Sequence, residues 1–148
     1  MNYSFFIPCV PPKATSQQKG ACRIGNGIRF FKKKHVQAAE NDLLSLLRPH
    51  APAAPMDGAI CLRIKFVFPW RASESQRIRR EFCEYPNTTR PDCSNIVKMV
   101  EDAMGRLNFF KDDGQNARLL VEKAWGDTPG IHVSLSPHEG IKRSAPAS

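Results

Sequence analysis

Acidic residues are absent from the first 39 positions of this 148-residue chain, up to Glu40. Seven basic residues and no acids give that stretch a formal charge of +7, out of +8 for the whole chain. Such an asymmetry favours a polyanionic partner, either nucleic acid or an anionic surface. For the run of Lys32, Lys33 and Lys34, solvated lysines without a function are an equally good explanation.

Long apolar segments are missing as well. The longest runs, at residues 59–62 and 66–70, are far shorter than the roughly 20 residues of a transmembrane helix. The first residues lack the positive region and the cleavage site of a secretory signal. The five cysteines are scattered without zinc-like spacing, which predicts reduced thiols in a cytoplasmic protein. The length predicts one domain with a single core.

Hydrophobic periodicity predicts both strands and helices. Apolar residues in β-type patterns predict strands at residues 2–10, 59–68, 119–124 and 131–135, and a hairpin at 22–31. Apolar residues at helical spacing predict helices at 35–47 and 95–107. The polar residues 71–90 are predicted to form a long loop, which in a compact domain is usually functional or disordered.

The acids of the chain gather around the second predicted helix. Residues 90–115 contain Asp92, Glu101, Asp102, Asp112 and Asp113, with Asp92 just before the helix and the Asp112–Asp113 pair just after it. Carboxylates are the hard oxygen ligands that magnesium prefers, and in a basic protein they can hold the ion against a phosphate backbone. The alternative is that each is an ordinary turn residue.

The helix itself sets a geometric condition on such a site. A helix of about 13 residues is about 20 Å long, so its two ends are far apart. Either the segment at residues 109–113 doubles back along the helix, or the second carboxylate comes from a partner subunit. Spacing alone leaves both open. The neighbouring Phe109 and Phe110 are predicted to pack in the core rather than to act as a base-stacking wedge.

Two smaller features belong to the same helix. Ser94 fits an N-cap, since a serine oxygen accepts a hydrogen bond from the first turn. Lys98 and Asp102 are four residues apart on the polar face, so that Asp102 can hold Lys98 in place. An ordinary surface ion pair is the simpler explanation of that spacing.

The ordered set of residues in this region resembles the RusA family of Holliday junction resolvases. The matching residues are Arg-Pro-Asp92-Cys-Ser94-Asn95-Ile-Val-Lys98, then Glu101-Asp102-Ala-Met, then Phe110-Lys-Asp112-Asp113-Gly-Gln115. Members of that family carry a D-x-D/S-N-L-x-K helix start, a D-A-L helix body and a D-D-x-Q turn. The resemblance extends to the flanks and predicts a RusA-like domain at residues 1–136, followed by a flexible tail at 137–148.

The resemblance implies a fold, an activity and a set of site residues. The expected fold is α+β, with a small mixed β-sheet and two main helices, assembled as a homodimer. The expected activity is that of a crossover junction endodeoxyribonuclease, which resolves four-way DNA junctions by paired nicks with magnesium, or with manganese in its place. By position, Asp92 and Asp113 match the catalytic, metal-binding aspartates, and Lys98 matches the catalytic lysine. Such an enzyme suits a phage or prophage and acts in the cytoplasm of a bacterial host.

One departure from the family pattern concerns the metal. The best-known members have a third aspartate at the position of Ser94, and a serine hydroxyl is a weaker, neutral ligand. Asp112 is therefore a further candidate ligand beside Ser94, while Asn95 is expected to orient a carboxylate. Two other hypotheses remain: a junction-binding protein of the same fold that no longer cuts, and a general basic nucleic-acid-binding module. Preference for junctions over linear duplex separates the last from the others.

DNA binding is expected to rest on phosphate contacts, and so to be salt-sensitive and shape-directed. The first candidates are the arginines that flank the acidic site along the chain, Arg77, Arg79, Arg80 and Arg90. The second candidates are Lys32, Lys33 and Lys34.

Overall fold

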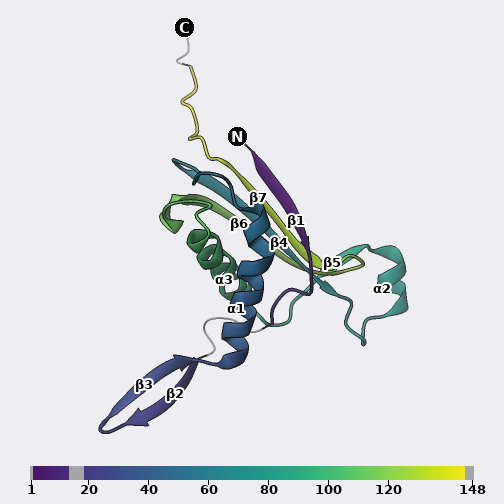
Figure 1. Cartoon of the computed structure of the whole chain (residues 1–148). Helices are drawn as coiled ribbons and strands as arrows, with labels where there is room; N and C mark the ends of the chain where they lie inside the picture. Colours follow the sequence, from purple (N-terminus) through teal and green to yellow (C-terminus); the bar gives the residue numbers. More distant parts are fainter. Residues whose placement is uncertain (1, 14–18, 146–148) are drawn as a thin grey trace.

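A five-stranded mixed sheet forms the centre of the computed structural model, which describes residues 2–13 and 19–145 (Figure 1). Its strands lie in the order β1-β7-β4-β6-β5. The bounds are β1 Tyr3–Pro8, β4 Ile60–Pro69, β5 Glu84–Pro86, β6 Asn116–Gly126 and β7 Gly130–Pro137. Only the β4–β6 pair in this sheet is parallel. The predicted α+β class with a mixed sheet is therefore confirmed.

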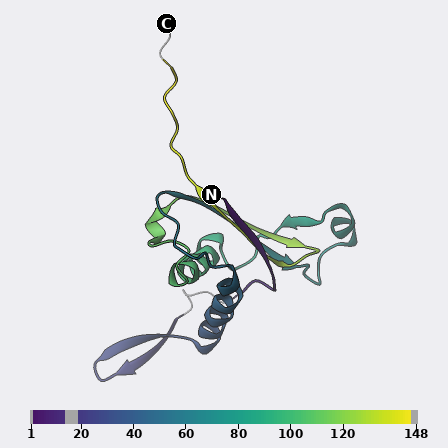
Figure 2. The same cartoon turned by 45° about the horizontal axis from the view of Figure 1, so that its top comes forward.

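Two long helices cover one face of this sheet. Helix α1 spans Lys34–Leu47 and helix α3 spans Cys93–Arg106, and Figure 2 shows both on the same side of the strands. The alternation of β4 explains the arrangement, because its inward side chains are at most 1% exposed: Ile60, Leu62, Ile64, Phe66 and Phe68. Phe109 and Phe110 are buried beside them, which confirms their predicted core role.

The predicted long polar loop at residues 71–90 is wrong in part. It contains a short helix, α2 at Gln76–Glu81, and the three-residue strand β5. The Ser75 side chain caps α2 by accepting a hydrogen bond from the Ile78 amide at 3.3 Å. Both elements are too short to produce a readable hydrophobic period, which is why the sequence pattern missed them.

The N-terminal hairpin is confirmed and stands apart from the sheet. Strands β2 at Lys19–Ile24 and β3 at Gly27–Lys32 pair only with each other, and Gly25 supplies a positive φ of 56° at their turn. Strands β6 and β7, predicted as neighbours along the chain, lie on either side of β4 rather than pairing. No helix within the described residues is long and apolar enough to cross a membrane.

Candidate active site

Helix α3 begins at Asp92 rather than at Ser94, so the predicted serine cap is wrong. The amides of Asn95 and Ile96 donate to the backbone oxygen of Asp92, at 3.1 and 3.0 Å. Asp92 has the extended backbone angles of a residue just outside the helix. The Asp92 side chain makes no capping hydrogen bond and is exposed. Its carboxylate oxygens are therefore not used by the helix.

Lys123, on strand β6 of the sheet, holds the segment that precedes Asp92 in place. The Lys123 Nζ donates to the backbone oxygens of Thr89 and Pro91, the latter at 2.6 Å. Asn87, which is buried, accepts from the amide and the hydroxyl of Thr89 at 2.8 and 2.7 Å. The Asn87 amide donates in turn to the Lys123 backbone oxygen at 3.1 Å. These bonds fix the backbone up to the residue before Asp92.

The turn after α3 is organised by Asp112 and Gln115. The two form a capping box around a short 3₁₀ helix, η2 at Asp113–Gln115. Asp112 accepts from the Gly114 amide at 3.0 Å, and Gln115 accepts from the Asp112 amide at 3.0 Å. The Gln115 side chain also donates to the backbone oxygens of Met56 and Gly58, at 2.9 and 3.0 Å. This turn is therefore anchored to the loop that precedes β4.

Lys98 joins this turn to the middle of α3. Its Nζ lies 3.1 Å from an oxygen of Asp113 and 3.1 Å from an oxygen of Asp102. The Asn116 side chain, one residue beyond η2, donates to Glu101 at 2.9 Å. The chain thus doubles back along the helix as far as Lys98, while the predicted meeting of Asp113 with Asp92 stays a prediction. The predicted Lys98–Asp102 contact is confirmed.

The site residues are not all in mutual contact. Asp113 hydrogen-bonds to Lys98, which lies six residues, or about 9 Å of helix rise, beyond Asp92. Ser94 is exposed in the first turn of α3, and Asn95 is half-buried beside it. Asp92 therefore lies at the start of α3, and Asp113 lies against Lys98 nearer its middle.

Electrostatics keep the Asp113–Lys98 pair charged. The Lys98 ammonium, which hydrogen-bonds to Asp113, holds the pKa of that carboxyl below its usual range. The bonds to Asp113 and Asp102 raise the pKa of Lys98. Two carboxylates and one ammonium leave a net negative charge at this point. Since all three side chains are exposed to solvent, the pair adds little to folding stability.

The donors present suit magnesium with an incomplete protein shell. Within the described residues, no group of three or more His, Cys, Asp or Glu could hold a metal ion. Magnesium is usually bound by one or two carboxylates, while waters and substrate phosphates complete its octahedron. Asp92 and Asp113 offer hard oxygen atoms, and the Asp92 carboxylate makes no capping hydrogen bond to its helix. In residue type, these two carboxylates are ligands that magnesium prefers.

An open cavity of about 520 Å³ lies beside the turn, between α1, α3 and residues 110–113. Five of its lining residues are acidic: Glu40, Glu101, Asp102, Asp112 and Asp113. Asp92 and Lys98 are not among the lining residues. Acids on this surface repel a phosphate backbone, so that a bound cation would be needed for DNA to approach closely.

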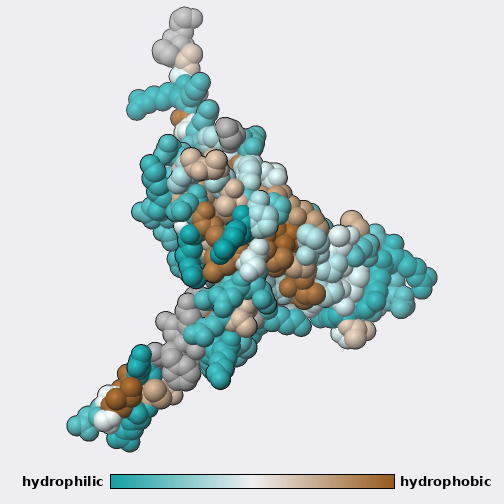
Figure 3. All heavy atoms as spheres, viewed as in Figure 1, coloured by the Kyte–Doolittle hydropathy of each residue, from teal (hydrophilic) through white to brown (hydrophobic). Residues whose placement is uncertain are grey.

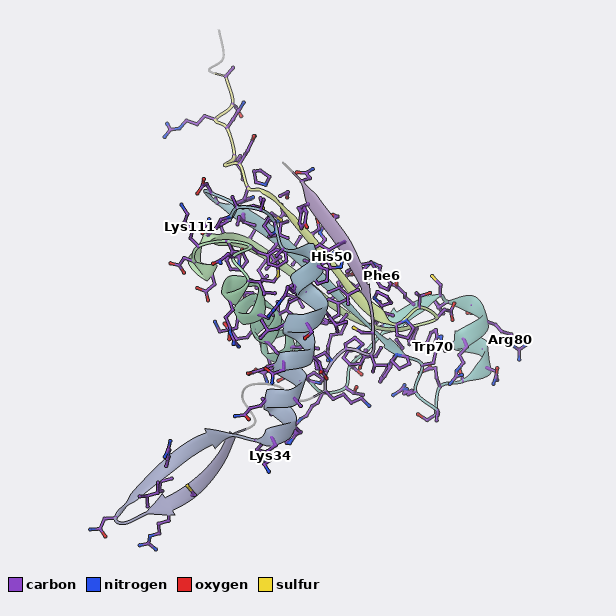
Figure 4. All side chains as sticks on the ribbon, viewed as in Figure 1. Phe6, Lys34, His50, Trp70, Arg80 and Lys111 are labelled. Carbon is purple, nitrogen blue, oxygen red and sulfur yellow. The ribbon has the colours of Figure 1, made fainter. Side chains whose placement is uncertain are left out.

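The predicted DNA-binding residues lie away from these acids. Arg77 and Arg80 are exposed on α2, where Figure 4 shows Arg80 pointing outward at one end of the molecule. Arg79, also on α2, instead donates to the Arg71 backbone oxygen at 2.7 Å. It therefore links α2 to the segment that precedes it. The exposed Arg90 lies just before Asp92.

The lysine run lies at the opposite end. Lys33 and Lys34 are exposed at the start of α1, and Figure 4 labels Lys34 there, beside the base of the hairpin. The Lys32 side chain lies outside what the structure describes. The structure therefore places the described basic candidates on α2, just before Asp92 and at the start of α1.

Sequence reasoning missed the roles of Gln115 and Lys123. For Gln115 a local signal exists, because the D-x-x-Q pattern from Asp112 is that of a capping box. For Lys123 there is none, because its partner Pro91 is 32 residues away along the chain.

The chain is similar to a known protein family and to known proteins over most of its length. The family described as endodeoxyribonuclease RusA matches residues 10–136, which include every site residue above. The crossover junction endodeoxyribonuclease rusA of Lactococcus phage r1t is 21% identical over 136 residues, covering 92% of this chain and 98% of the phage protein. The uncharacterized protein YqaN of Bacillus subtilis strain 168 is 32% identical over 135 residues, covering 84% of this chain and 89% of that protein.

Proposed function

The chain belongs to the RusA family of endodeoxyribonucleases, and we propose that it is a magnesium-dependent enzyme that resolves four-way DNA junctions by paired nicks. The observation that carries the proposal is the contact of Lys98 with Asp113. It joins the two halves of the motif, which are 15 residues apart, on one exposed surface of a basic protein. The phage relative, named as a crossover junction endodeoxyribonuclease, supports the same activity.

Each side chain has a role in this proposal. Asp92 and Asp113 would hold the ion, with manganese as an alternative to magnesium. An ion bound there supplies an activated water and polarises the scissile phosphate. The Lys98 ammonium offsets the charge that builds on the phosphate oxygens during attack. Asp102 keeps Lys98 in place, since it binds the same Nζ as Asp113 does.

The remaining residues support these three. Asp112 fixes the turn that carries Asp113, because its carboxylate already accepts from Gly114. Asn95 orients the Asp92 region from the first turn of α3. Ser94 is a weak ligand at most. Arg77, Arg80, Arg90, Lys33 and Lys34, all exposed, bind phosphates of the junction and make binding salt-sensitive.

A homodimer follows from the chemistry of the substrate. Two opposed strands must be cut, and a chain with one motif has one site, so a two-fold dimer supplies the second. From the sequence, the exposed faces of the strands at residues 2–10 and 59–68 are the expected contact, but the apolar residues of β4 are buried in the core of their own chain. Strand β1, at the edge of the sheet, is the remaining candidate for the contact. Sedimentation should give about twice the chain mass of 16.6 kDa, and a monomer that makes paired incisions would contradict the arrangement.

A second candidate function is a junction-binding protein that does not cut. Ser94 favours it, because this exposed side chain brings no charge to the first turn of α3, which contains no acid at all. One assay separates the two. A synthetic four-way junction with labelled strands is incubated with and without magnesium, beside a linear duplex of the same sequence. We expect paired incisions in the junction only with the metal. Tight junction binding without incision, with magnesium or manganese, would select the second candidate.

A further inference from the structure

Within the described residues, the hairpin formed by β2 and β3 pairs with no strand of the main sheet. It projects beyond the start of α1, away from the sheet, in both Figure 1 and Figure 2. Every described side chain from Ala21 to Arg29 is exposed, including Ile24 at 55% and Ile28 at 68%. A two-stranded hairpin alone is at best marginally stable in water. An element of this kind is expected to gain its stability from something outside the chain.

The positive charge of the hairpin favours an anionic partner. Residues 19–32 of the hairpin contain four basic residues and no acid, and Lys33 and Lys34 follow directly. A second copy of the same hairpin would place like charges together, which is unfavourable. A polyanion instead releases its condensed counterions when it meets such an arm.

The two faces of the hairpin argue against an apolar protein groove. Residues that face each other across the strands share a face, so Arg23 lies with Ile28 and Arg29 lies with Cys22. Each face therefore carries an arginine among small or apolar residues, and neither is continuously apolar. Figure 3 shows the same mixture, with brown and teal spheres side by side on the projecting arm.

We propose that this hairpin is an arm that grips one duplex arm of the junction through its phosphates, outside the crossover. The proposal rests on the junction activity proposed above and names the part of the DNA that the arm contacts. Each strand has six residues, about 20 Å of extended chain, and B-DNA's major groove admits a two-stranded ribbon. Arg23 and Arg29 at its far end are the described side chains most suited to phosphate contact. The arm adds affinity and takes no part in the chemistry.

The test compares Arg23→Gln/Arg29→Gln with Lys142→Gln/Arg143→Gln, which removes the same charge from exposed residues after β7. Junction binding is measured without magnesium at several salt concentrations. We expect the slope of log K against log salt to fall by about 0.9 for each arginine that meets a phosphate. The control variant should keep the wild-type slope. The exposure of both arginines predicts an unchanged unfolding temperature.

A second substrate locates the contact. The same measurements use a junction whose arms are shortened and closed by DNA loops, so that they stay paired. Wild type and Arg23→Gln/Arg29→Gln should bind this junction equally. Three outcomes would overturn the proposal: an unchanged slope in the arginine variant, an equal loss in the control, or a full loss that persists on the short-armed junction. If the protein binds junctions through the hairpin but never cuts them, the proposed nuclease activity is rejected. The proposal that the hairpin binds DNA is then still supported.

Discussion

The region around α3 and the projecting hairpin differ in what holds them in place. Around α3, side chains from distant parts of the chain fix the backbone: Lys123 reaches Thr89 and Pro91, and Gln115 reaches Met56 and Gly58. In the hairpin, the two strands pair with each other, and the described side chains at residues 21–29 face solvent. A rigid acidic surface suits the positioning of a reaction. An exposed basic arm suits affinity for DNA of variable shape.

This contrast gives a simple expectation for mutants. Substitutions around α3 should change the cleavage rate and the metal requirement but leave binding of the junction close to normal. Substitutions in the hairpin should change binding and its salt dependence. A variant near α3 that lowers only the affinity for the junction would contradict this assignment of cleavage to α3 and binding to the hairpin.

The largest effect is expected from removing either aspartate of the site. Asp92→Asn and Asp113→Asn should each lower the rate of junction cleavage by about 10²-fold or more, since a metal contributes several kcal/mol. Binding should be kept or improved, because each change removes a negative charge near DNA. Cleavage of labelled junctions and a gel-shift titration measure the two quantities. Near-normal cleavage by both variants would reject the assignment.

The next effect tests whether Lys123 positions Asp92. Lys123→Met removes both hydrogen bonds to the segment before Asp92, and supporting groups of metal ligands are typically worth 10- to 100-fold. We expect a higher magnesium concentration for half-maximal cleavage and a loss of rate of about that size. Lys123→Arg, which keeps the donors, should recover part of it. Lys142→Met is the control for lost charge.

A purely structural role of Lys123 would give another pattern. Loss of two charged hydrogen bonds also destabilises the fold, by roughly 1.5–3 kcal/mol per bond at most. If Lys123→Met lowers only the unfolding temperature and keeps the wild-type magnesium requirement, it does not act through Asp92.

How far the sequence predicted this region depends on the range of each interaction. The α3 stripe and the alternation of β4 are local periodicities, and the Lys98–Asp102 contact follows from a four-residue spacing on a helix. Each of these was predicted and is observed. The start of α3 was misplaced because Asp92 and Ser94, two good cap residues, compete within three positions and the spacing does not choose between them.

Interactions across the fold had no local signal. The Lys123 contacts depend on β6 lying beside the segment before α3, and that placement exists only once the sheet has formed. Strand β5 has three residues at the sheet edge, too few for a period of two to be recognised. The doubling back of the chain along α3 was one of two alternatives for joining Asp113 to Asp92, and the contact of Asp113 with Lys98 was not predicted.

A smaller effect is expected at Ser94, which no longer has a capping role to lose. Ser94→Ala should change the free energy of unfolding by no more than about 0.5 kcal/mol, as at other exposed positions. Ser94→Asp adds a carboxylate one residue beyond Cys93 in the first turn, where the helix dipole also favours negative charge. It should lower the magnesium concentration for half-maximal cleavage by several-fold. An unchanged requirement would place Ser94 away from the metal.

The smallest effect concerns the titration of Asp113. Because Lys98 lowers the pKa of Asp113, the pair is intact above the ordinary carboxyl pKa and is lost as pH falls through the lowered value. Lys98→Met should therefore move the pKa of Asp113 upward, as measured by NMR of the carboxyl carbon. Lys111→Met is the matched control, since Lys111 lies two residues from Asp113 but pairs with Asp57 at 3.1 Å. An equal upward shift in both variants would mean that general positive charge, rather than the Lys98 contact, sets the ionisation of Asp113.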